Sequence, residues 1–157
     1  MYNILKSFIL RKRFVKMKLK ANFFKELTVT ELYEIVRARQ EVFLMEQNII
    51  CRDFDGVDYE ALHCFLWDGD RVSAYLRAYR GEGGEVHIGR VLSIPRGQGL
   101  GKRLMLESMP IIREKFACDS ISLHSQCHAE GFYEKLGFKR MGDVFLEEGI
   151  PHINMRL

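Results

Sequence analysis

Residues 91–102, VLSIPRGQGLGK, constrain the fold of this chain more than any other stretch. A short apolar run typical of a strand meets a Pro-Arg-Gly turn, and glycines at positions 97, 99 and 101 lead directly into an amphipathic run that begins LGKRLMLE. This order predicts a strand, a tight loop and a helix. Because the first N–H groups of a helix have no partner inside it and lie at the positive end of its dipole, the loop predicts a binding site for a phosphate or pyrophosphate.

Two common phosphate-binding patterns do not fit this loop. The dinucleotide fingerprint requires GxGxxG, and the nucleotide P-loop requires GxxxxGK followed by Ser or Thr. The pattern that fits is RxxGxG, formed by Arg96, Gly99 and Gly101, and it resembles the pyrophosphate loop of the GNAT N-acetyltransferases, which bind acetyl-CoA. A second motif, AEGFYEKLGF at residues 129–138, resembles the fourth helix and exit turn of the same family.

Three flanking stretches resemble the ElaA-like branch of that superfamily: VFLMEQ at residues 42–47, HIGRV at 87–91 and EEGIPHINMR at 147–156. The resemblance implies an α/β fold with a mixed, mostly antiparallel, twisted sheet of about seven strands flanked by helices, splayed between strands 4 and 5. It also implies an enzyme that moves an acetyl group from acetyl-CoA to a primary amine, by direct attack in a ternary complex.

The hydrophobic pattern agrees with such a fold. The predicted strands are residues 20–27, 61–67, 72–80, 85–94, 119–126, 138–146 and 150–157. The predicted helices are residues 31–43, capped by Thr28 or Thr30, residues 100 to about 116, and about 129 to 136, which ends at Gly137. Residues 47–58, rich in Asp, are predicted to form a loop.

Two residues interrupt the helical patterns. Arg39 lies on the otherwise apolar face of the helix at residues 31–43, and we expect its stem to follow that face while its charge stays in solvent. Pro110 lies inside the helix at residues 100–116, where its ring removes a backbone hydrogen bond and clashes with the preceding turn. We therefore expect a kink or break near residues 106–110.

Length and charge predict one domain behind a basic extension. A chain of 157 residues is long enough for one substantial core and short for two. Residues 1–20 hold seven Lys or Arg and no acid, so residues 21–157 carry 17 basic against 21 acidic side chains, a net charge of −4. An acidic body argues against nucleic acid as a partner. We expect residues 1–19 to be an extension and residues 20–157 a single acetyltransferase domain.

The extension does not have the pattern of a secretory signal. Its apolar run at residues 8–10 is too short, and the basic cluster at residues 11–13 follows that run instead of preceding it. We expect a disordered or loosely helical segment, with Met17 as an alternative start. No apolar run approaches the ~18 residues that a membrane span requires, so stable membrane insertion is not expected.

The cysteines predict reduced thiols. Cys51, Cys64, Cys118 and Cys127 form no CxxC pair, and without a secretory signal their even number does not indicate disulfides, which favours a cytoplasmic protein. No second ligand pair accompanies Cys127 and His128, so no metal site is expected.

The resemblance assigns roles to residues of both motifs. Those implied to hold acetyl-CoA are Val91, Leu92, Ser93, Arg96, Gly97, Gln98, Gly99, Leu100, Gly101, Lys102 and Gln126. Tyr133 occupies the position where many members carry the general acid for the departing thiolate. The alternative is that Phe132 and Tyr133 are both packing aromatics, and we favour the functional role for Tyr133 alone.

The sequence identifies the general base less clearly than it does the cofactor loop. His152 follows an acidic turn on the hairpin that, by resemblance, borders the acceptor, and an imidazole can take a proton near neutral pH. His63, Glu46, Arg90 and Glu148 are the other polar candidates.

Several alternatives stay open at this level. The chain could be a CoA-binding sensor without turnover, or an RNA- or membrane-associated module that uses its basic head. The acceptor could be a small amine, an amino sugar, an antibiotic, a peptide N-terminus or a protein lysine, and a homodimer is allowed. Because Glu147 and Glu148 would form a carboxylate rim, we expect a cationic amine.

Overall fold

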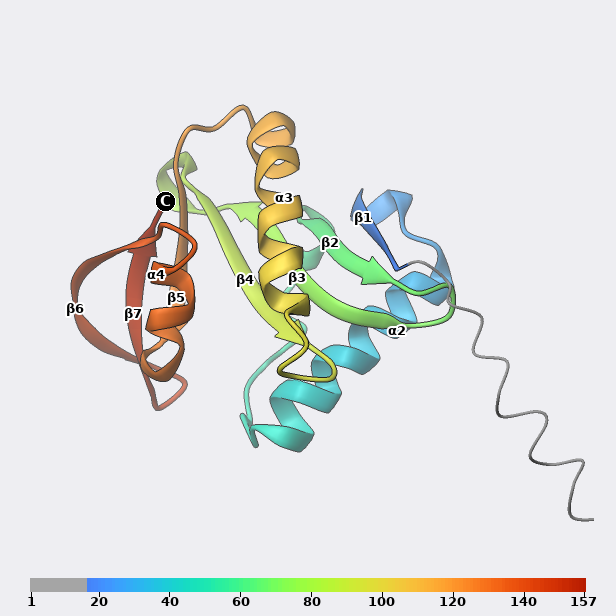
Figure 1. Cartoon of the computed structure of the whole chain (residues 1–157), viewed down its shortest axis with the longest axis horizontal. Helices are drawn as coiled ribbons and strands as arrows, with labels where there is room; N and C mark the ends of the chain where they lie inside the picture. Colours follow the sequence, from blue (N-terminus) through green and yellow to red (C-terminus); the bar gives the residue numbers. More distant parts are fainter. Residues whose placement is uncertain (1–16) are drawn as a thin grey trace, which may run out of the picture.

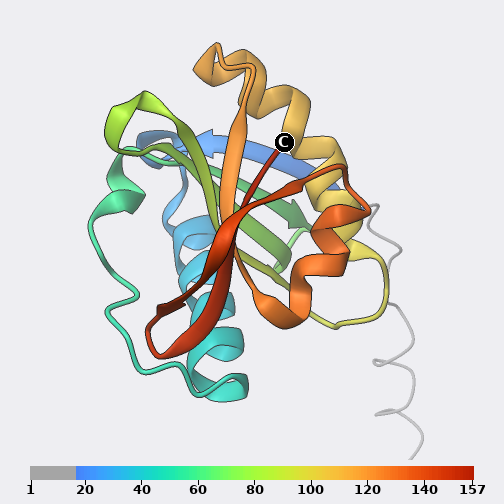
Figure 2. The same ribbon diagram turned by 90° about the vertical axis from the view of Figure 1, so that its left-hand side faces the viewer.

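A seven-stranded sheet forms the centre of the protein in the computed structural model, which describes residues 17–157 (Figures 1 and 2). The strand order is β1-β2-β3-β4-β5-β7-β6, and only β4 and β5 pair in parallel. The strands are β1 (Lys18–Phe23), β2 (Leu62–Trp67), β3 (Val72–Arg80), β4 (Val86–Ser93), β5 (Ile121–Gln126), β6 (Lys139–Glu147) and β7 (Ile150–Arg156). The mixed α/β fold predicted from the sequence is confirmed, whereas the expectations for residues 1–16 lie outside the described residues.

Helices cover both faces of the sheet. The helical segments are η1 (Phe24–Glu26), α2 (Val29–Arg39), the π-helix η2 (Gln40–Glu46), η3 (Val57–Tyr59), η4 (Glu82–Gly84), α3 (Leu100–Phe116), η5 (Cys127–Ala129) and α4 (Glu130–Glu134). On β2, Leu62, Cys64 and Leu66 belong to the core beneath α3 and α4, while Phe65 belongs to the core beneath α2. This alternation is what a strand covered on both faces requires.

The predicted element boundaries agree closely with the structure. β3 and α3 span the predicted residues, and the closing hairpin turns at residues 147–149. Thr28 caps α2, because its hydroxyl accepts from the Glu31 N–H (3.2 Å) and the Glu31 carboxylate accepts from the Thr28 N–H (2.9 Å). The first strand begins and ends earlier than predicted, since η1 takes up the residues after Phe23.

The break predicted in α3 is wrong. The helix continues through Pro110 to Phe116. Pro110 and Leu106, the residue whose carbonyl loses its hydrogen bond, both lie on the exposed side of α3. A carbonyl on that side can accept from water instead, so the helix need not end there.

The predicted splay between strands 4 and 5 is confirmed. β4 and β5 pair only from Val86 to Ile88 and from Ile121 to Leu123, and then separate. The glycine loop follows β4 and η5 follows β5, so both lie at the open end of the separated strands.

The expectation that Arg39 keeps its charge in solvent is wrong. Its side chain is 1% exposed and donates to Asp53 Oδ2 (3.0 Å) and Asp58 Oδ1 (2.8 Å). The loop at residues 47–58 brings these carboxylates to the guanidinium. Burial opposes ionisation of Asp58, but hydrogen bonds from Arg39 and Arg77 outweigh it and lower its pKa. The guanidinium is therefore a buried anchor for the loop.

Replacement of this anchor should destabilise the protein. We expect Arg39→Met to lower the free energy of unfolding by about 3 kcal/mol, because it leaves the half-buried carboxylates of Asp53 and Asp58 short of a partner. The matched control is Arg37→Met on the same helix, since Arg37 pairs with Glu34 and Glu41 nearer the surface and should change stability by about 1 kcal/mol or less. Urea unfolding measures both, and equal losses would contradict the anchor.

Candidate functional site

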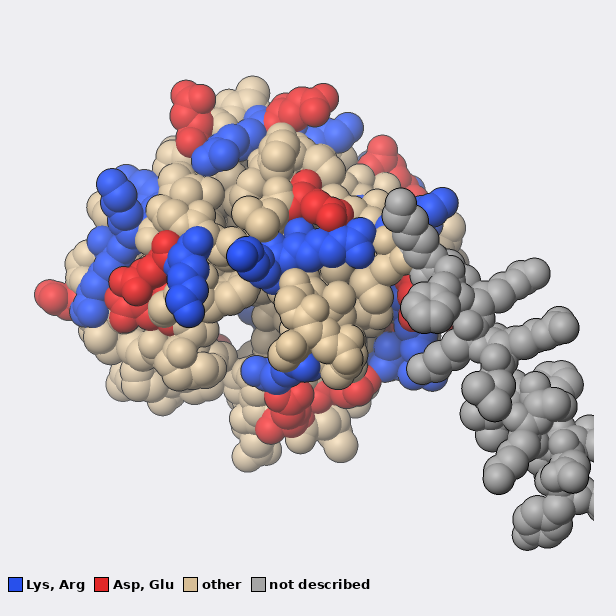
Figure 3. Space-filling model, viewed as in Figure 1, with Lys and Arg blue, Asp and Glu red and all other residues tan. Residues whose placement is uncertain are grey.

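The separation of β4 and β5 opens a cleft of about 960 Å³. Figure 3 shows it as an opening through the molecule between the surface of α4 and the end of β4. The cleft is lined by every residue that the sequence assigned to acetyl-CoA except Gln98, namely Val91, Leu92, Ser93, Arg96, Gly97, Gly99, Leu100, Gly101, Lys102 and Gln126. Tyr133 and His152 line the same cleft.

The glycine loop forms one end of the cleft. Gly97 and Gly99 have φ values of +77° and +73°, which side chains rarely adopt, and Gly99 directly precedes α3. The first hydrogen bond of α3 runs from the Arg103 N–H to the Gly99 carbonyl (3.0 Å). The N–H groups of residues 100–102 thus lack partners inside the helix and point toward the loop. A Cβ at Gly97 or Gly99 would meet no atom within 4 Å, so the space beside them is open.

A β-bulge shapes β4 beside the cleft. Tyr75 pairs with Leu92 and Arg77 with Gly89, so β4 has one more residue than β3 between these pairs. Arg90 lies in this bulge with φ +56°. The extra residue interrupts the ladder to β3, which leaves backbone polar groups near Val91 facing the cleft.

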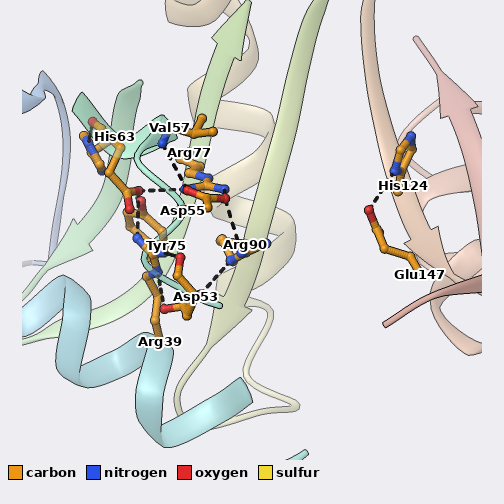
Figure 4. A network of polar contacts seen from close by, with 11 residues as sticks. Arg39, Asp53, Asp55, Val57, His63, Tyr75, Arg77, Arg90, His124 and Glu147 are labelled. Carbon is orange, nitrogen blue, oxygen red and sulfur yellow. Dashed lines mark hydrogen bonds and ion pairs between the residues drawn. The ribbon is translucent and has the colours of Figure 1, made fainter. Parts of the chain in front are cut away.

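Three arginines and three aspartates form one ion-pair network on the β3–β4 wall (Figure 4). Besides the contacts of Arg39, Arg77 donates to Asp58 Oδ1 (3.0 Å) and to Asp55, and Arg90 Nε donates to Asp53 Oδ1 (2.7 Å). Burial opposes ionisation of Asp55, but hydrogen bonding to Arg77 lowers its pKa to about 2. The network ties residues 53–58 to the wall with its charges balanced.

His63 contacts this network through the backbone of Asp58 and does not line the cleft. Its Nε2 lies 2.9 Å from the Asp58 carbonyl, which can only accept, so Nε2 carries the proton and Nδ1 accepts from the Tyr75 hydroxyl (2.8 Å). Burial lowers the pKa of His63 and keeps the ring neutral. These contacts leave His63 without a free nitrogen for proton transfer.

Tyr133 is both a packed ring and a cleft residue. Its ring packs edge-on against Phe132 (5.0 Å between centroids) and Phe138 (5.9 Å). Burial raises the pKa of its phenol, which therefore stays protonated. Among residues 17–157, no hydrogen-bond partner occupies the hydroxyl.

His152 lies opposite Gln126 in the β5–β7 ladder and is 7% exposed. Its Nδ1 is 2.8 Å from the Ile150 carbonyl. A carbonyl only accepts, so Nδ1 carries the proton of the neutral ring and Nε2 keeps its lone pair. Nε2 lies 3.7 Å from Glu147 Oε2.

His124 and Glu147 form a hydrogen-bonded pair on the wall made by β5, β7 and β6, beside His152. Sequence reasoning missed this pair. Figure 4 shows them across the cleft from the arginine network. His124 Nδ1 lies 3.3 Å from Glu147 Oε1, and this hydrogen bond raises the pKa of His124 and lowers that of Glu147. His124 lies on β5 and Glu147 at the end of β6, and no sequence motif joins them. The pair could be found only from the order and register of β5, β7 and β6.

The end of η2 bridges both walls at the mouth of the cleft. Glu46 Oε1 lies 2.7 Å from Arg96 Nε in the glycine loop, and Gln126 Nε2 on β5 donates to Gln47 Oε1 (3.3 Å). Glu46, one of the polar candidates from the sequence, therefore contacts the phosphate loop. Glu46 thus competes for Arg96 with an anion that binds in the glycine loop.

Residues 17–157 hold neither a membrane-spanning helix nor a cluster of metal ligands. No helix there is long and apolar enough to cross a membrane. No group of three or more His, Cys, Asp or Glu side chains in that part of the chain could hold a metal ion. The four cysteines are free thiols.

Comparisons with a family model and with individual proteins point to the same family. A family described as an acetyltransferase (GNAT) domain matches residues 35–157. A UPF0039 protein of Schizosaccharomyces pombe is 36% identical over 139 residues, 86% of this chain and 93% of that protein. Protein ElaA of Escherichia coli is 34% identical over 136 residues, 83% of this chain and 89% of that protein.

Two crystal structures share the fold with similar sequences. An acyl-CoA N-acyltransferase from Pseudomonas aeruginosa aligns with a TM-score of 0.82 at 34% identity and covers 89% of this chain and 98% of its own. Escherichia coli ElaA aligns with a TM-score of 0.82 at 31% identity and the same coverage.

We expect Glu46 to compete with the phosphates of a bound CoA for the guanidinium of Arg96. We expect Glu46→Gln to tighten the binding of CoA about two- to fivefold, the range that an exposed ion pair supports. Calorimetric titration with CoA measures the change. Glu41→Gln is the matched control, because Glu41 lies on the same π-helix but pairs with Arg37. Unchanged or weaker binding by Glu46→Gln would contradict the competition.

Proposed function

We propose that this chain, which belongs to the GNAT acetyltransferase family and to its ElaA-like branch, transfers an acetyl group from acetyl-CoA to a primary amine in a ternary complex. The family assignment predicted from the two sequence motifs is confirmed by the match over residues 35–157. Membership makes the chain an acyltransferase that uses an acyl-CoA donor. The acetyl group, the primary amine and the direct attack are the proposal. One observation carries it: the glycine loop, Tyr133 and His152 line a single cleft.

The glycine loop is suited to the pyrophosphate of the donor. The N–H groups of residues 100–102 supply unpaired donors at the positive end of α3, and Arg96 and Lys102 add charge. Backbone groups from Val91 to Ser93, beside the bulge, are suited to the amides of pantetheine and to the acetyl carbonyl. A donor held in this way presents its thioester between the separated strands.

His152 is suited to accept the proton of the incoming ammonium. Its Nε2 lone pair is free because Nδ1 donates to the Ile150 carbonyl, and Glu147 lies close enough to stabilise the resulting imidazolium. The neutral amine then attacks the carbonyl carbon, and polar backbone groups at the bulge stabilise the oxyanion.

Tyr133 is suited to protonate the departing thiolate. The C–S bond breaks as the tetrahedral intermediate collapses, and the sulfur takes the proton of the phenol. Burial keeps that phenol protonated until the thiolate forms. The attacking nitrogen still carries one proton too many, and it passes this proton to the tyrosinate, which restores the phenol. His152 releases the first ammonium proton to solvent, so the products are the amide, the free thiol of CoA and one proton.

Acetyl-CoA should stabilise the native protein selectively. By mass action on the folded state, it should raise the melting temperature, whereas NAD and ATP should raise it much less. Gly99→Asp should abolish this shift by placing a carboxylate at the phosphate position. Gly99→Asn is the matched control, since it has the same shape at the same left-handed position without the charge. Equal shifts with all three nucleotides would contradict the donor assignment.

Removal of the Tyr133 hydroxyl should slow turnover. We expect Tyr133→Phe to lower kcat roughly 10²- to 10⁴-fold, as for loss of a general acid, while the Kd for CoA stays within a small factor. Tyr59→Phe is the control, because Tyr59 is exposed and lies outside the cleft. Unchanged turnover would make Tyr133 a packing residue, and CoA binding without transfer to any amine would favour a sensor.

A further inference from the structure

We propose that the acceptor is an arylalkylamine, a primary amine joined by a short chain to an aromatic ring, and that its ring rests on a row of side-chain rings at the end of the cleft away from the glycine loop. This inference rests on the proposed function, because it names the acceptor of the same reaction.

Five rings form this row, one from each of five neighbouring strands. Adjacent centroids are 5.9 Å apart from Tyr79 to His87, 6.2 Å from His87 to His124, 4.9 Å from His124 to Phe145 and 6.1 Å from Phe145 to His152. The row crosses the point where β4 and β5 separate, and all its members except Phe145 line the cleft. Ring pairs at these distances and tilts have the geometry that aromatic side chains prefer.

The row extends away from the site of the proposed reaction. His152 is its near end, opposite Gln126 at the cofactor side of β5. His87 lies four residues before Val91 on β4, a distance of roughly 13 Å at the rise of a strand. An amine that reaches His152 can therefore lay its body along His124 and His87 toward Tyr79.

Gly89 leaves room for a flat group beside this row. Its φ is outside the left-handed region, so the backbone does not demand glycine at this position. A Cβ there would lie 3.9 Å from Tyr79 Cε1 and 4.0 Å from Arg77 Nε, which makes the glycine part of the floor next to Tyr79. The absent side chain widens the cleft where the acceptor's ring would lie.

The charges at this end favour an ammonium without a carboxylate. Glu147 contacts His124 and approaches His152, and Glu148 lies next to it in the lining. The guanidinium groups of Arg77 and Arg90 are already paired with aspartates. Arg77 Nε has no hydrogen-bond partner among residues 17–157, but aspartates neutralise the charge of both guanidinium groups. A carboxylate therefore meets little net positive charge here, whereas an ammonium meets carboxylates and ring faces.

The test compares kcat/KM for matched primary amines with acetyl-CoA as donor. 2-Phenylethylamine should exceed 2-cyclohexylethylamine about fivefold and butylamine tenfold or more, because the cyclohexyl group matches its size without a π face. Phenylalanine, which adds a carboxylate, and spermidine, which lacks a ring, should each be at least about tenfold poorer. A preference for spermidine, phenylalanine or butylamine would overturn the proposal.

Two variants locate the ring on the row. Gly89→Val fills the floor, and Tyr79→Leu removes the far ring; each should lower the ratio of kcat/KM for 2-phenylethylamine over butylamine about tenfold. Tyr33→Leu is the control, because Tyr33 is exposed on α2 and does not line the cleft. Both variants should keep the melting shift with acetyl-CoA, which shows that the fold and the donor site are intact. An unchanged ratio in both variants would overturn the proposal.

A binding measurement separates failure of this inference from failure of the proposed function. If no amine is acetylated although acetyl-CoA raises the melting temperature, the proposed turnover is wrong. Calorimetric titration of the CoA-saturated protein with 2-phenylethylamine then decides the inference. Binding that Tyr79→Leu weakens would support the row as an arylalkylamine site, and absence of binding would overturn it.

Discussion

The parallel ladder between β4 and β5 ends after three residue pairs, and the geometry of the site depends on that early end. Had the strands stayed paired, their backbone groups would be satisfied by each other and no cleft would exist between them. Their separation places the glycine loop on one wall, with α4 on the other. It also lets a β-bulge at Arg90 leave polar backbone groups facing the open space.

A network of ion pairs around two buried arginines, Arg39 and Arg77, supports one wall of this cleft. Arg39, Arg77 and Arg90 hold residues 53–58 against β3 and β4, and their pairing with three aspartates leaves the wall close to neutral. Such pairs add little net stability once desolvation is counted, but loss of one partner is strongly destabilising. The network thus fixes the position of the loop. The acceptor end is lined by Glu147 and Glu148 and by rings from both walls of the cleft.

Much of the donor end could be predicted from the sequence, and the acceptor end could not. Gly97 and Gly99 were found from a local pattern, because a tight turn into a helix needs glycine within a few positions. The partners of Arg39 were missed, since an arginine on an apolar helical face has the same pattern whether it reaches solvent or a buried aspartate. The contact of Glu46 with Arg96 was missed for the same reason: it joins segments whose distance depends on the whole sheet.

By itself the sequence determined the elements: strands from alternation, the cap of α2 from Thr28 and Glu31, and the loop–helix junction at Gly99, all of which are interactions within a few residues. Only the tertiary structure decided which side chains meet across strands, namely the row of rings from Tyr79 to His152, the tautomer of His152 and the pairing of His124 with Glu147. The physical reason is that these contacts depend on strand order and register, and a shift of one residue in register would turn each of these side chains to the opposite face of the sheet.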